Sequence, residues 1–130
     1  MEAPKYFNDL QKQYFNKIIH VLKNNGLFSD KYWLSIELLA VNMAQFQWSI
    51  MRINRLNNAI DGEGYIQTYE SGAKAISVEL TIKKKAEDSI TMLLKQFGFD
   101  PKSEKDIKSI IEDGSEDAFE NFRLKKVENK

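Results

Sequence analysis

Apolar residues concentrate in one stretch of this chain, from Lys31 to about Ile60. Its centre, Tyr32 to Met51, reads YWLSIELLAVNMAQFQWSIM and carries one charge, Glu37. The apolar positions recur at three- and four-residue steps, which predicts a single long helix. A helix with so few charges has too little polar face to show to water, so it must be covered on more than one side.

Two apolar stripes follow this predicted helix. The first has the alternating steps of a coiled-coil seam, and the second lies on a different face. The first consists of Ile36, Leu39, Met43, Phe46, Ile50, Ile53, Asn57 and Ile60, and the second of Leu34, Leu38, Val41, Trp48 and Met51. A chain of 130 residues has little material to cover both. We therefore predict that the first stripe, from Ile36 to Ile53, contacts another copy of the chain. Asn57 in this seam costs stability but can fix the register or the oligomer number.

Shorter helices are predicted on both sides of the long one. Helical apolar spacing indicates a helix from Tyr6 to about Asn25. Ser77 is expected to cap a second helix that runs to about Phe97, where Gly98 stops it.

The remaining segments are short. Residues 65–77 favour extended backbone around a glycine and predict a loop or short hairpin. Ser103 resembles the cap of a helix from about Glu104 to Glu112. The predicted fold is therefore all-α, a helical hairpin core with a long central helix and a short loop or hairpin insert. We divide the chain into a helical domain, 1–112, and a charged tail, 113–130.

Composition limits the functions that remain. The 19 basic and 19 acidic residues balance, so only a local patch could attract nucleic acid. The chain has no cysteine, which excludes disulfides and thiolate chemistry. Polar residues such as Asn42 and Gln45 occur all along the apolar stretch, which argues against a membrane helix.

Residues for catalysis are scarce. The single histidine, His20, is expected to be a packing or surface residue, because a general base needs a positioned partner. No nucleophile elbow or phosphate-binding loop is present. Asp61 and Glu63 lack the ligand ladder of a calcium loop and suit a solvated turn. We predict no enzyme activity, no metal and no cofactor.

Basic residues give the stronger signal. Lys83, Lys84 and Lys85 are consecutive in the predicted third helix, and further candidates for phosphate contact are Lys74, Arg52 and Arg55. The alternative is a solvated helix face. Residues 1–31 also carry five lysines against three carboxylates, a net charge of +2. No helix has the polar exposed side chains that a recognition helix needs.

A more specific pattern runs from Gly64 to Asp106. A glycine turn leads into Thr68–Lys74, then into a Ser-initiated helix that contains Ala86–Glu87 and Leu93–Leu94. The segment closes with Phe-Gly-Phe-Asp-Pro-Lys-Ser at 97–103. Together with the long apolar, aromatic-containing helix, this order resembles phage terminase small subunits of the P27 type.

The likeness covers about residues 6–107. Asp100 stands where the family usually has Thr, and Val78 where a proline often sits. The resemblance implies a non-catalytic protein that forms a homo-oligomeric ring in the cytoplasm of the bacterial host. It also implies that the protein binds double-stranded viral DNA at the packaging start and recruits or regulates the large terminase subunit, which is the motor and nuclease.

Two other functions remain open, a helical oligomeric adaptor that does not bind DNA and a small phage transcription regulator. The role of the tail also has two interpretations. Its spaced apolar residues Phe119, Phe122 and Leu124 are candidates for binding a partner such as the large subunit. The alternative is a disordered solubilising tail.

Overall fold

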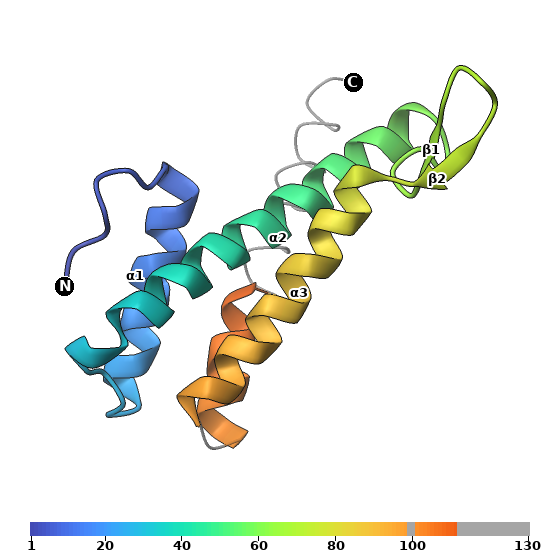
Figure 1. The fold of residues 1–130 in the computed structure, drawn as a ribbon. Helices are drawn as coiled ribbons and strands as arrows, with labels where there is room; N and C mark the ends of the chain where they lie inside the picture. The colour runs from blue at the N-terminus through green and yellow to red at the C-terminus, as the bar shows by residue number, and fades with distance from the viewer. Residues whose placement is uncertain (99–100, 112–130) are drawn as a thin grey trace, which may run out of the picture.

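The computed structural model describes residues 1–98 and 101–111 and shows a mostly helical protein (Figure 1). The elements in chain order are α1 (Asp9–Asn24), a 3-10 helix (Asp30–Tyr32), α2 (Trp33–Ala59), β1 (Ile66–Thr68), β2 (Lys74–Ile76) and α3 (Val78–Phe97), and residues 101–111 are also helical. α2 and α3 lie side by side as a helical hairpin, and α1 packs along the first half of α2. The predicted all-α class is confirmed, with the insert folded as a two-stranded antiparallel hairpin.

A reciprocal cap begins α1. The side chain of Asn8 accepts from the backbone N–H of Gln11, and the side chain of Gln11 accepts from the backbone N–H of Asn8, both at 2.9 Å. The prediction began this helix at Tyr6, because apolar spacing extends upstream of the cap. Phe7 is nevertheless buried outside the helix, with its ring edge-on to Phe15 at a centroid distance of 6.0 Å.

One face of α2 forms the centre of the core. Ile36, Leu39 and Met43 have no exposed surface, and they belong to one cluster with apolar residues of α1, α3 and residues 101–111. Ile53 keeps 4% exposure. The prediction that Ile36, Leu39 and Met43 contact another copy is therefore wrong, because other helices of the same chain already cover them.

The two other predicted contact residues, Phe46 and Ile50, are half-buried. Phe46 packs against the core cluster, and the Nζ of Lys83 lies 5.5 Å from its ring centroid. Asn57, predicted to fix the register or the oligomer number, forms a hydrogen bond within the chain: its Oδ1 accepts from the backbone N–H of Gly64 at 2.7 Å.

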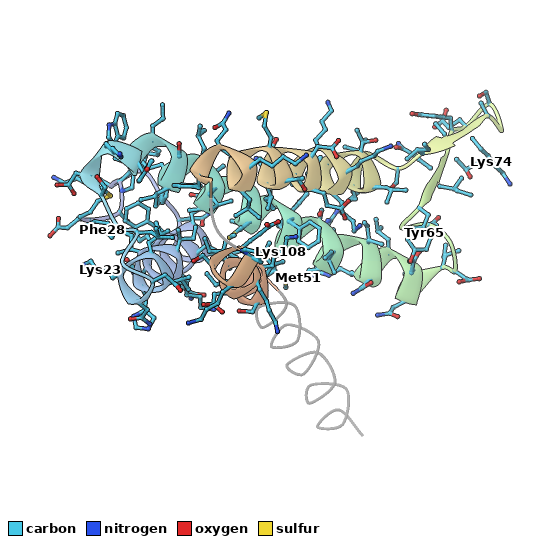
Figure 2. The ribbon with its side chains drawn as sticks, turned by 90° about the horizontal axis from the view of Figure 1, so that it is seen from below. Lys23, Phe28, Met51, Tyr65, Lys74 and Lys108 are labelled. Atoms are coloured by element: carbon cyan, nitrogen blue, oxygen red, sulfur yellow. The ribbon has the colours of Figure 1, made fainter. Side chains whose placement is uncertain are left out.

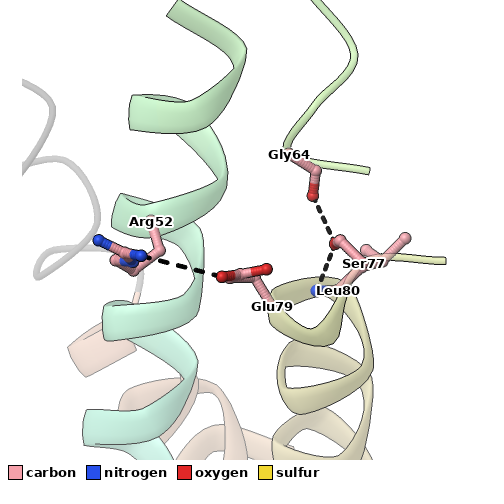
Figure 3. Close-up of polar contacts among 5 residues, drawn as sticks. All are labelled: Arg52, Gly64, Ser77, Glu79 and Leu80. Carbon is pink, nitrogen blue, oxygen red and sulfur yellow. Dashed lines mark hydrogen bonds and ion pairs between the residues drawn. The ribbon is translucent and has the colours of Figure 1, made fainter. Parts of the chain in front are cut away.

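Gly64 and Ser77 close the base of the hairpin (Figure 3). The hydroxyl of Ser77 donates to the carbonyl oxygen of Gly64 at 2.7 Å and accepts from the backbone N–H of Leu80 at 3.0 Å, which caps α3. A Cβ on Gly64 would lie 2.4 Å from the carbonyl oxygen of Ile53, so glycine is required by close approach to α2.

The end of α3 follows the prediction, since Gly98 adopts the left-handed conformation with φ 63°. The next helix does not. Ser103 was predicted to cap it, but the helix already includes Pro101, and Ser103 is buried inside it at 2% exposure. Proline suits the first turn because its missing N–H has no partner there anyway. The predicted tail, 113–130, lies outside the described residues.

Candidate nucleic-acid and subunit interfaces

The three consecutive lysines of α3 point in different directions. Successive residues of a helix are about 100° apart, so three in a row cannot share one face. Lys83 turns toward α2, and its Nζ lies 2.5 Å from Oε1 of Glu87. Lys84 and Lys85 are exposed. Two of the three predicted lysines therefore present their charge to solvent.

Arg52 is a link between helices rather than an open cation. Its Nη2 lies 4.0 Å from Oε1 of Glu79 in the first turn of α3 (Figure 3). Its guanidinium also lies 5.9 Å from the ring of Trp48. The Nε is buried without a hydrogen-bond partner among the described residues. Arg55, three residues further along α2, is exposed.

Lys74 lies on the hairpin, at the opposite end of the molecule from Lys23 of α1 (Figure 2). It is exposed, but residues 60–76 also contain Asp61, Glu63 and Glu70, so this segment has a net charge of −2. A negative segment repels phosphates. The structure therefore distributes the six predicted DNA-binding residues over α2, β2 and α3 and does not gather them into one patch.

Sequence reasoning gave too little weight to a more basic region. Residues 1–31 and 101–111 together contain eight lysines and five carboxylates, a net charge of +3, whereas residues 33–98 contain seven basic and seven acidic residues. The two basic segments touch, with Asn25 Nδ2 3.3 Å from Asp106 Oδ2. The signal available in the sequence was the net charge of +2 on residues 1–31. Residues 101–111 add one more positive charge to it.

An open groove of about 430 Å³ lies between α1 and residues 101–111. Lys17 and His20 line one side of it, and Asp106 and Ser109 line the other. His20 is exposed, and its Nε2 lies 3.1 Å from Nδ2 of Asn24, which agrees with its predicted surface role. Within the described part of the chain, no group of His, Asp or Glu side chains is arranged to hold a metal ion.

The second apolar stripe of α2 stays open to solvent. Leu34, Leu38, Trp48 and Met51 are between 45% and 51% exposed, and Val41 between them is half-buried. We call these five residues the outer stripe. Of the two apolar faces that the sequence indicated, the one predicted as the contact between copies is buried at Ile36, Leu39, Met43 and Ile53, and the other stays exposed at four of its five residues.

Comparison with known proteins decides the family. The family model described as phage terminase, small subunit, matches residues 12–113, which is most of the chain. The chain belongs to the phage terminase small-subunit family. The resemblance seen in the sequence is thus confirmed at family level, while the P27 type stays a prediction. No match was found among curated proteins or solved structures.

Family membership gives this terminase small subunit a role in phage DNA packaging. None of the helices within residues 1–98 and 101–111 combines the length and hydrophobicity needed to cross a lipid bilayer.

Proposed function

We propose that this protein binds double-stranded viral DNA at the packaging start site and recruits or regulates the large terminase subunit in the cytoplasm of the bacterial host. The observation that carries the proposal is the family match over residues 12–113. In this role the protein performs no catalysis itself, and it assembles as a homo-oligomeric ring that presents its basic surface to DNA.

DNA contact occurs mainly through phosphates. The supporting observation is the separation of charge: the end formed by α1 and residues 101–111 is net positive, and the hairpin end is net negative. Exposed lysines such as Lys12, Lys17 and Lys105 belong to the positive end, and Lys84 and Lys85 on α3 are additional contacts. Such contacts hold the duplex without reading bases. Lys83 and Arg52, engaged with Glu87 and Glu79, contribute less.

The test measures binding to duplex DNA from the packaging region over a range of salt concentrations. Replacing Lys12, Lys17 and Lys105 with alanine should weaken binding and flatten the salt dependence, by about 0.9 in the log–log slope for each phosphate that is no longer neutralised. Replacing Lys84 and Lys85 should have a smaller effect of the same kind. Lys74→Ala is the matched control and should leave both affinity and slope unchanged.

Two outcomes contradict the proposal. No binding by the wild-type protein at low salt would exclude DNA as a partner. A loss of binding in Lys74→Ala equal to that of the triple variant would move the site to the hairpin.

A second candidate is the helical oligomeric adaptor without DNA binding. The overall charge balance and the open outer stripe favour it. An assembled wild-type protein that fails to retard DNA at any salt concentration would support the adaptor. The transcription regulator has no comparable support.

We also propose that the tail recruits the large subunit through Phe119, Phe122 and Leu124, which lie outside the described residues. Deleting 114–130 should abolish binding of the large subunit in a pull-down and leave the number of copies in the assembly unchanged. If the deletion breaks up the assembly, the tail belongs to the contact between copies.

A further inference from the structure

Two groups of large apolar side chains remain exposed on the described part of the chain. The first is the outer stripe of α2. The second, which we call the hairpin patch, consists of Ile60, Tyr65, Ile66, Ile76 and Val78, each at least half exposed. Exposed apolar side chains that share a surface mark an interaction site in a soluble protein.

The hairpin patch has a regular apolar centre. Ile66 and Ile76 are cross-strand partners on one face of the hairpin and are 50% and 67% exposed. The sheet has only two strands and extends past the ends of α2 and α3 (Figure 1). An isolated two-stranded hairpin is marginally stable in water, so packing on another surface would stabilise it.

The charges of the two surfaces are complementary. The C-terminal end of the outer stripe is bordered by the exposed Arg55, whereas the neighbouring Arg52 is already paired with Glu79. The segment that carries the hairpin, residues 60–76, has three carboxylates and one lysine. Opposite potentials favour this pairing, and the same negative charge argues against DNA as the partner of the hairpin.

We propose that the hairpin patch of one copy packs on the outer stripe of α2 of a second copy. This inference rests on the self-association that belongs to the proposed function, and it names the two surfaces that meet. The two surfaces differ, so each copy gives its hairpin to one neighbour and receives the hairpin of another. A heterologous contact of this kind closes into a ring if the rotation between copies allows it. A contact between two outer stripes would leave the hairpin patch uncovered.

The test uses two full-length variants that each damage one surface. The hairpin variant carries Ile66→Ser and Ile76→Ser, and the stripe variant carries Leu34→Ser and Leu38→Ser. All four side chains are exposed, so both variants should fold, with wild-type circular dichroism and thermal unfolding. Met92→Ser on α3 is the matched control, because Met92 is 55% exposed and lies outside both surfaces. Mass is measured by light scattering.

The proposal expects wild type and Met92→Ser to assemble and both surface variants to be monomers. An equimolar mixture of the two variants should then contain dimers, because the intact hairpin of one can dock on the intact stripe of the other. An assembled hairpin variant overturns the proposal, as does a mixture that stays monomeric. Contact between like surfaces would instead leave one of the two variants assembled on its own. A monomeric wild-type chain overturns self-association itself, whatever the DNA experiment shows.

Discussion

Leu38 and Leu39 are neighbours in the sequence and have opposite environments. Leu39 has no exposed surface and packs in the core cluster, whereas Leu38 is 45% exposed on the outer stripe. Both belong to apolar stripes at helical spacing, so the hydrophobic pattern alone does not predict which of the two is buried. The two leucines differ in whether other helices of the chain pack over them. Apolar residues of α1, α3 and residues 101–111 belong to the same buried cluster as Leu39, and Leu38 is outside it. An apolar stripe in a sequence therefore predicts that one face of a helix will be covered. Only the fold shows whether the covering residues belong to the same chain.

The largest expected effect tests this comparison directly. Leu39→Ala should lower the free energy of unfolding by about 2–5 kcal/mol, because it removes buried methyl groups and leaves a cavity. Leu38→Ala, the matched control, should change the stability of the single chain by less than about 0.5 kcal/mol. Urea denaturation at a concentration where the protein is monomeric measures both. Equal losses would show that the outer stripe is covered within the chain.

A smaller effect is expected at the start of α3, which positions that helix on the buried face of α2. Ser77→Ala removes the cap on Leu80 and leaves the carbonyl oxygen of Gly64 without its donor. The expected cost is about 1–2 kcal/mol of unfolding free energy. Ser71→Ala at the exposed hairpin turn is the control. If thermal unfolding gives the same midpoint for both variants, the buried hydroxyl does not stabilise this junction.

The smallest effect is expected at the border between the two faces, where Arg52 reaches Glu79. The pair is 4.0 Å apart and partly exposed, so solvent screening limits its value to about 0.5 kcal/mol or less. A double-mutant cycle of Arg52→Met and Glu79→Gln measures the coupling. A coupling above about 1 kcal/mol would mean that the α2–α3 packing depends on this ion pair, and not on apolar burial alone.

Much of the fold could be predicted from the sequence. The long helix, the cap at Ser77 and the stop at Gly98 follow local rules of spacing and backbone conformation, and the structure confirms them. The error at Ser103 was also local, since two signals for a helix start compete there and the position of Pro101 decides.

The surfaces were harder to predict, because they depend on contacts between distant residues. The proximity of α1 to residues 101–111 creates the basic end, and no local pattern reveals that the two segments touch. The turning of Lys83 toward Phe46 likewise depends on where α3 packs on α2. A run of three lysines in a sequence looks like one patch, but helix geometry divides it between an ion pair and solvent.

The junction at Gly64 and Ser77 has a consequence for how this protein can vary. Directly beyond that hydrogen bond, the backbone N–H of Ser77 donates to the carbonyl oxygen of Tyr65 at 2.9 Å. Residues 65–76 thus leave and re-enter the helical body at almost the same point. Lengthening such a closed loop adds little entropic cost, on the order of 0.6 kcal/mol for each doubling. The hairpin can therefore be lengthened at its turn without moving α2 or α3.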